Sequence, residues 1–427
     1  MVSLRCTPLT FLLTGFTWLV LFSLLGIATL LGLVYGTPLP TWLRAVHVHG
    51  ILIGGLLQLM IGGLLASIAF KGNQAFSDSR PWLFLFFNGA TLALLAFLGL
   101  KQDPLAGAMG LLLAGIVASL AKPAWRHVRE QFVGPACAAW VYGASFGALF
   151  TGLLVGSGMP FHLSAEYYPH ARLLHLHLIV LGWFTLAMLA FTQHLVPLVL
   201  RWELVSPKIG KLTTGLLLAG FAALVGSFVT SSLRFELAIG IFLLANLGLY
   251  AANLFRTWIE SGSAGNAAAD HLLIAIVFLV LATATGILMG VNFLPDPPIF
   301  PIGSLHLVAY THLAFIGFMT NIVCGALSYG LPAFLATSRV PSSKKRGPYQ
   351  ERLYAVMNRW RTVQLVGISF GSMGLAVVAA LTWSVPLGSL SVRISTWISI
   401  GLLLSGLTLF SAKLAWISGL RPSRSAS

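Results

Sequence analysis

Charged residues are scarce in this sequence. Only 8% of its 427 residues are Asp, Glu, Lys or Arg, whereas 57% are hydrophobic, and the mean hydropathy is +0.90. A water-soluble protein of this length needs far more charge to cover its surface, so the soluble classes of enzyme and binding protein are excluded. The composition instead indicates a polytopic membrane protein whose apolar surface faces lipid.

Cysteine is also scarce. The three cysteines, Cys6, Cys137 and Cys324, lie far apart and form no Cys-x-x-Cys pair. This spacing gives no support for a disulfide framework or for a metal cluster held by thiolates. The sequence also lacks the Cys-x-x-Cys-His motif that attaches heme covalently, so any heme would be held noncovalently.

Long apolar runs make up most of the chain. A helix needs about 20 mostly apolar residues to cross a bilayer. The sequence therefore predicts an all-α integral membrane protein with about twelve transmembrane helices and no soluble domain. The predicted helices are 9–35, 45–70, 81–101, 104–121, 134–157, 170–200, 209–231, 234–256, 270–292, 302–332, 362–384 and 392–418.

The net charge of +15 follows the predicted topology. If the N-terminus is cytoplasmic, twenty of the 25 basic residues, Lys413 among them, lie on the cytoplasmic side. This bias obeys the positive-inside rule, so the charge indicates orientation and contact with anionic lipid, and no nucleic-acid partner is expected. We expect a single domain over 1–427 in the inner (plasma) membrane, both termini in the cytoplasm, a basic cytoplasmic loop over 333–361 and a flexible tail over 421–427.

One pattern occurs three times in the chain. An apolar run that opens with histidine begins within 43–54 (LRAVHVHGILIG), within 171–197 (ARLLHLHLIVLGWFTLAMLAFTQHLVP) and within 310–332 (YTHLAFIGFMTNIVCGALSYGLP). We call these three runs the histidine motifs. Their aligned residues are His49, His177 and His312, with His47, His175 and Tyr310 two residues earlier and Gly54, Gly182 and Gly317 five residues later.

Histidines inside membrane helices indicate a functional site, because burying an ionisable group in a bilayer is costly. The second, sixth and tenth helices run in the same direction, so their histidines should lie at similar depth in the outer leaflet. Residues i and i+2 lie about 200° apart around a helix, so a His-x-His pair can serve two neighbouring sites. Imidazole is a common ligand of heme iron and of copper, which predicts a heme or metal centre here.

The alternative for each histidine is a purely structural hydrogen bond between helices. We prefer that alternative for four of the others, with His170 intermediate. The four are His127, interpreted as a solvated residue of a 122–133 loop, and His162, His194 and His271.

Taken together, these features resemble the large subunit of heme–copper oxidases and nitric oxide reductases over nearly the whole chain. LRAVHVHG is similar to the segment that supplies the low-spin heme ligand on helix two of that family. THLAFIGFMTNIVCGALSYGLP looks like the helix-ten motif of the nitric oxide reductases. The resemblance implies twelve helices in three pseudo-repeated arcs and a heme b held by His47 and His312.

The chain departs from that family at the binuclear centre. Tyr310 stands where the high-spin heme ligand is expected, the seventh helix (209–231) has no histidine pair for copper, and the sixth helix has no internal acidic residue. A standard oxygen- or NO-reducing centre is therefore not expected. We hypothesise a second site for a heme or a copper ion, built from residues on the second, sixth and tenth helices, namely His49, His175, His177 and His306.

The resemblance implies electron transfer, or the binding or reduction of NO or O₂, and leaves open whether the protein is an enzyme. Electrons would come from a partner cytochrome, a quinol or a partner redox subunit, because the chain has no soluble redox domain. Two other classes stay open: a membrane transporter or metal permease that uses the histidine cluster, and a structural membrane subunit whose histidines bind nothing.

Overall fold

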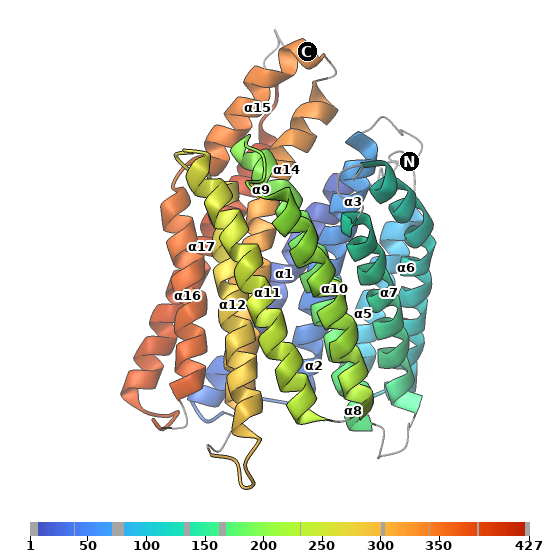
Figure 1. Cartoon of the computed structure of the whole chain (residues 1–427), viewed down its shortest axis with the longest axis vertical. Helices are drawn as coiled ribbons and strands as arrows, with labels where there is room; N and C mark the ends of the chain where they lie inside the picture. The colour runs from blue at the N-terminus through green and yellow to red at the C-terminus, as the bar shows by residue number, and fades with distance from the viewer. Residues whose placement is uncertain are drawn as a thin grey trace. The chain divides into compact units, whose positions relative to one another are not determined.

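The described part of the protein is helical throughout. In a computed structural model of the chain, twelve helices are long and apolar enough to cross a membrane, and no strand occurs among the described residues (Figure 1). This confirms the prediction of an all-α, multi-span membrane protein. The structure describes residues 7–37, 39–70, 81–131, 137–161, 168–230, 232–299, 304–340, 342–381 and 384–422.

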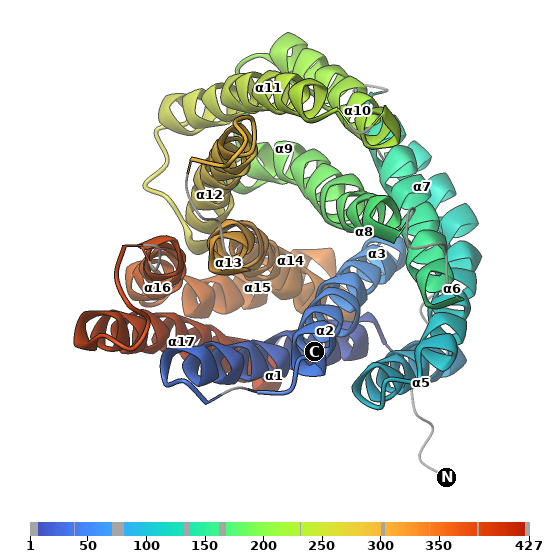
Figure 2. The same cartoon turned by 90° about the horizontal axis from the view of Figure 1, so that it is seen from below.

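The chain divides into two compact units, Met1–Phe184 and Thr185–Ser427, and the boundary falls inside the sixth spanning helix. The single domain and the three arcs both stay predictions. In the first unit α5, α6 and α7 lie side by side (Figure 2). Its elements are α1 (Pro8–Val34), α2 (Trp42–His49), η1 (Gly50–Leu57), α3 (Gln58–Phe70), α5 (Pro81–Gly99), α6 (Asp103–Gln131), α7 (Cys137–Gly158), η2 (Met159–Phe161), α8 (Tyr168–His177) and the start of η3 (Leu178–Thr185).

The second unit pairs its last two spanning helices closely. Gly367 and Gly371 on one helix meet the backbone of the other at Leu403 and Gly406, because small residues let membrane helices approach. These helices are α16 (Arg361–Leu381) and α17 (Leu390–Gly419), which lie side by side in Figure 2. The other elements are α9 (Leu186–Leu200), α10 (Pro207–Thr230), α11 (Leu233–Glu260), α12 (Ala267–Asn292), α13 (Ser304–His312), η4 (Leu313–Thr320), α14 (Asn321–Arg339) and α15 (Ser343–Asn358).

The spans that carry the histidine motifs are the most buried. In the second, sixth and tenth spans 67%, 61% and 61% of the apolar window is buried inside the protein, against 50% or less in the other nine spans. Lipid-facing helices expose an apolar side, whereas a helix surrounded by others does not. The apolar parts of these three spans are therefore the most enclosed by protein, whereas the histidines at their heads are half-buried.

Two segments predicted as loops are helical. Helix α6 continues through Pro123 to Gln131, so 122–131 is not a loop. His127 on it is only 7% exposed and shares a hydrogen bond of 2.8 Å with Ser67, which corrects its interpretation as a solvated residue. The turn of helix that begins at Pro123 buries Ala124, His127 and Val128 along one side, and this burial favours helix over loop.

The predicted basic loop 333–361 is likewise folded. Helix α14 runs on to Arg339, and α15 follows from Ser343 to Asn358. Three apolar or aromatic side chains, Tyr349, Leu353 and Met357, recur at four-residue spacing and are buried, so the segment forms an amphipathic helix. Of the predicted tail 421–427, only Arg421 and Pro422 lie within the described residues, and neither is helical.

A buried polar chain connects four helices of the second unit. Its members are Lys413 on α17, Gln364 on α16, His271 on α12 and Asn321 on α14, with exposed fractions of 3%, 0%, 0% and 0%. Lys413, which the positive-inside rule counts on the cytoplasmic side, is buried within the second unit, and its side of the membrane stays a prediction. The ammonium of Lys413 donates to Gln364 Oε1 at 2.7 Å and to the Met357 carbonyl at 3.0 Å.

The hydrogen bonds between these four residues all run in one direction, with Lys413 as the first donor and Asn321 as the last residue. Gln364 Nε2 donates to His271 Nε2 at 2.7 Å, because its amide oxygen already accepts from the ammonium of Lys413. His271 Nδ1–H donates to Asn321 Oδ1 at 2.6 Å. The amide of Asn321 then donates to the carbonyl of Gly317 at 2.6 Å. Donors and acceptors match only when His271 is neutral, so the structural interpretation of this histidine holds.

We expect Gln364→Leu to lower the free energy of unfolding by roughly 1–3 kcal/mol for each buried group that loses its partner. Those groups are the ammonium of Lys413 and the Nε2 atom of His271. Thermal unfolding of the purified protein in detergent measures the change. The matched control is Gln102→Leu in an exposed turn, which should change stability little. Equal decreases in the free energy of unfolding of the two variants would contradict the conclusion that these hydrogen bonds stabilise the protein.

Candidate histidine site

Each histidine motif has the same backbone plan. A short α-helix ends at His49, His177 or His312, and a π-helical segment of 8 residues begins at the next residue. The π-segments η1, η3 and η4 then pass back into α-helix. π-Helical turns are rare and concentrate at functional sites. Three copies in one register show that the sequence repeat is also a structural repeat.

The glycine shared by the histidine motifs lies within each π-segment, and in two of them it admits a neighbouring aromatic ring. The indole of Trp18 on α1 occupies the space that a Cβ at Gly54 would need. The ring of Phe278 on α12 does the same at Gly317. A larger residue at either position would push the ring away, so close packing explains why glycine recurs there.

The second histidine of each motif is anchored to its own helix. The Nδ1–H groups of His49, His177 and His312 donate to the backbone carbonyls four residues earlier, at 2.8, 2.9 and 2.6 Å. A carbonyl oxygen only accepts hydrogen bonds, so the ring hydrogen must be on Nδ1. In the neutral ring the lone pair is then on Nε2, which is the arrangement that metal-binding histidines use.

The first histidine of two motifs is held by the preceding spanning helix. His47 Nδ1–H donates to the Phe22 carbonyl on α1 at 2.6 Å, and its ring fills the space beside Gly26. His175 Nδ1–H donates to the Gly152 carbonyl on α7 at 2.7 Å, and its ring fills the space beside Gly156. In the neutral ring these two histidines therefore also carry the lone pair on Nε2.

The third motif keeps the same position with a different side chain. The ring of Tyr310 lies against Gly286 on α12, 3.1 Å from the position that a Cβ there would take. Tyr310 is thus the structural counterpart of His47 and His175. The position in the motif and the glycine on the preceding spanning helix are preserved, whereas the imidazole is replaced by a phenol.

Two of the residues predicted for a second metal site, His49 and His175, lie in the first unit and within range of a long-range electrostatic interaction. Among the described residues no group of three or more His, Cys, Asp or Glu side chains could hold a metal ion. The side chain of His306 lies outside the described part of the chain, so the predicted fourth ligand stays a prediction. His47 is in the first unit and His312 in the second.

Two buried polar groups in the first unit lack any hydrogen-bond partner from the described residues. Gln58 is 0% exposed, and neither its amide nitrogen nor its amide oxygen is paired. Trp183 is 4% exposed, and its indole N–H is unpaired. An unsatisfied buried polar group costs roughly 1–3 kcal/mol, so these groups indicate a polar partner other than the protein.

Gln58 and Asn321 are structural counterparts, because each is the first residue after its π-segment. Asn321 is satisfied by His271, whereas the amide of Gln58 is not. Neither was singled out in the sequence, although an amide just below a histidine motif in an apolar helix is a signal that could have been used. His194 and His170 are exposed, and His162 lies outside the described residues.

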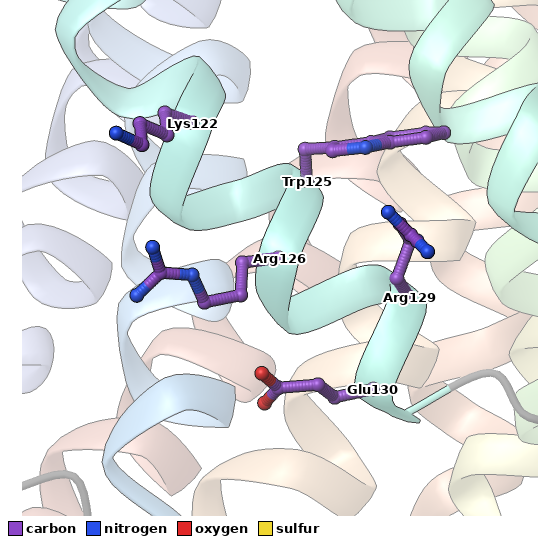
Figure 3. Close-up of a pocket in the computed structure, with 5 residues that line it drawn as sticks. All are labelled: Lys122, Trp125, Arg126, Arg129 and Glu130. Carbon is purple, nitrogen blue, oxygen red and sulfur yellow. The ribbon is translucent and has the colours of Figure 1, made fainter.

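A surface pocket lies at the end of α6. Its lining residues all come from that helix: Lys122, Trp125, Arg126, Arg129 and Glu130 (Figure 3). Lys122, Arg126 and Glu130 point to one side of the helix, whereas Trp125 and Arg129 point to the other (Figure 3). The pocket is basic and contains no histidine, so its chemistry differs from that of the histidine motifs.

No family model matches this chain, and no curated protein matches it. Interpretation of the histidine motifs therefore depends on their residues and geometry.

We expect Gly156→Ala to displace the imidazole of His175, because the added Cβ and the ring compete for one space. Overpacking of this kind costs about 1–3 kcal/mol, and thermal unfolding measures it. Gly147→Ala is the matched control, since it lies on the same helix with open space around it. That control should be neutral or slightly stabilising. A harmless Gly156→Ala would show that the ring is not held there.

Proposed function

We propose that this protein binds heme b noncovalently through the histidine motifs, with His47 and His312 as the axial ligands. The observation that carries the proposal is the repeated Nδ1–H bond to a backbone carbonyl at both histidines. It fixes the tautomer whose Nε2 is a good ligand of iron. Bound heme would supply a one-electron carrier, or an iron atom that binds a small gas.

The residues around the histidine motifs fit such a group. Burial of the helices that carry them provides the dry surroundings that heme requires. The orphaned amide of Gln58 and indole of Trp183 are polar groups that a bound cofactor, or water held with it, would satisfy. His49 is the alternative axial ligand on the second helix, since it shares with His312 the bond to its own helix.

The function that follows is electron transfer, or the binding or reduction of NO or O₂, in the inner (plasma) membrane with both termini in the cytoplasm. The electron donor would be a cytochrome, a quinol or a partner redox subunit. If the protein turns over, it is an oxidoreductase of the cytochrome oxidase or nitric oxide reductase type. Support comes from the residues of the histidine motifs and their similarity to that superfamily.

A reduced-minus-oxidised visible spectrum of the purified protein tests the proposal. We expect the sharp bands of a six-coordinate heme b, lost in His312→Ala and in whichever of His47→Ala and His49→Ala removes the second ligand. His194→Ala, an exposed histidine that is not among the proposed ligands, is the control and should keep the bands. A protein without heme bands would contradict the proposal and favour a transporter or metal permease.

A second site for a heme or a copper ion would use His49 and His175, with His177 and His306 as further ligands. The proximity of His49 and His175 supports it. Metal analysis of the purified protein should then find more metal than one heme iron, and His175→Ala should lose the excess but keep the heme spectrum. One heme iron and no other metal would eliminate the second site.

A further inference from the structure

We propose that Arg359, Trp360 and Trp416 form a binding site for the headgroup of an anionic phospholipid. We call these three residues the Arg–Trp site. They lie in the second unit, where α15 ends, α16 begins and α17 ends. The proposal is independent of the function proposed for the histidine motifs.

The cation of the site lies over two indole rings. The Cζ atom of Arg359 is 4.4 Å from the ring centroid of Trp360 and 5.8 Å from that of Trp416. Both distances are within the range of a cation–π interaction. The two indoles are 58% and 48% exposed, so a ligand from outside can reach the group. The guanidinium carries five N–H donors, which can bind a ligand while the cation lies near the rings.

The guanidinium of Arg359 makes no hydrogen bond to any residue that the structure describes, and no described carboxylate lies within 4.0 Å of it. The neighbouring Arg361 is already used, since it pairs with Asp270 at 3.4 Å. Arg359 is therefore the basic residue of the Arg–Trp site that is available to bind an anion. A phosphate group suits it, because two phosphate oxygens can accept parallel N–H bonds from one guanidinium.

The backbone of Trp360 is strained. Its φ of +52° lies in the left-handed region, which bulky residues rarely adopt. Such strain costs about 1–3 kcal/mol and concentrates at functional sites. Here it lies at the junction between α15 and α16, where the indole is held beside Arg359.

An apolar stripe beside the site indicates that the phosphate belongs to a lipid. Val363, Val366 and Phe370 recur at three- and four-residue spacing on one side of α16, and they are 58%, 41% and 65% exposed. They lie within the candidate membrane span Arg361–Leu381, where acyl chains are the expected surroundings. Tryptophan and arginine together are typical of the level where headgroups meet acyl chains.

Further cations favour an anionic headgroup over a zwitterionic one. Lys345 and Arg352 on α15 precede Arg359, the C-cap residue of that helix, at intervals of seven residues, so Lys345 and Arg352 lie along one side of the helix. Lys345 and Arg352 are exposed. Each basic side chain near a membrane surface adds about 1 kcal/mol of attraction to anionic lipid.

Native mass spectrometry of the full-length, detergent-purified protein tests the proposal. The probes are phosphatidylglycerol and phosphatidylcholine with the same acyl chains. We expect tighter binding of phosphatidylglycerol, weakened about fivefold by Arg359→Gln, with little change for phosphatidylcholine. Lys211→Gln removes an equal charge from an exposed position in the first turns of α10, and it should leave both affinities unchanged.

Two further measurements keep the test decisive. Trp416→Leu retains every charge but removes one ring, so a loss of phosphatidylglycerol binding there supports the site even if Arg359→Gln misfolds. Soluble glycerol phosphate should compete poorly, because it lacks the acyl chains. Equal binding of the two lipids, an equal effect of Lys211→Gln, or full competition by glycerol phosphate would each overturn the proposal.

Discussion

A hydrogen bond from imidazole Nδ1 to a backbone carbonyl determines the chemistry of the histidine motifs. The acceptor cannot donate, so the bond leaves one neutral tautomer and assigns the lone pair to Nε2. Five histidines, on three spanning helices, make this bond. The surrounding features are arranged around it: glycines beside the rings of His47 and His175, π-segments after the second histidines, and burial of the three helices.

The buried polar groups next to two of the histidine motifs differ in how they are paired. Around His271 each donor meets an acceptor, and the chain ends on the carbonyl of Gly317 in the π-segment after His312. That network ties helices together and leaves no group for a ligand. Below His49 the counterpart of Asn321 is Gln58, whose amide has no partner among the described residues. The contrast separates a fully paired network from a buried amide that is unpaired among the described residues.

Hydropathy and histidine spacing predict much of this arrangement. The twelve spans, and the grouping of histidines on the second, sixth and tenth, follow from apolar run length and from the threefold repeat. The π-segments do not follow, because residues that are apolar on every side show no periodicity that distinguishes π from α. The sequence also does not predict that Gly26 and Gly156 lie beside the rings of His47 and His175, because these contacts are made between different helices. The burial of Lys413 does not follow either, because the positive-inside rule counts charge and takes no account of a polar network that can bury it.

The central claim is that the histidine motifs hold heme iron through imidazole nitrogen on both sides. Electron paramagnetic resonance of the oxidised, purified protein tests it most directly, because the spectrum reports the axial ligands of the iron. The account predicts a low-spin ferric heme signal that is lost or becomes high-spin in His312→Ala and is unchanged in His194→Ala. A purified protein without a ferric heme signal, or one whose low-spin signal survives in His312→Ala, would contradict the account.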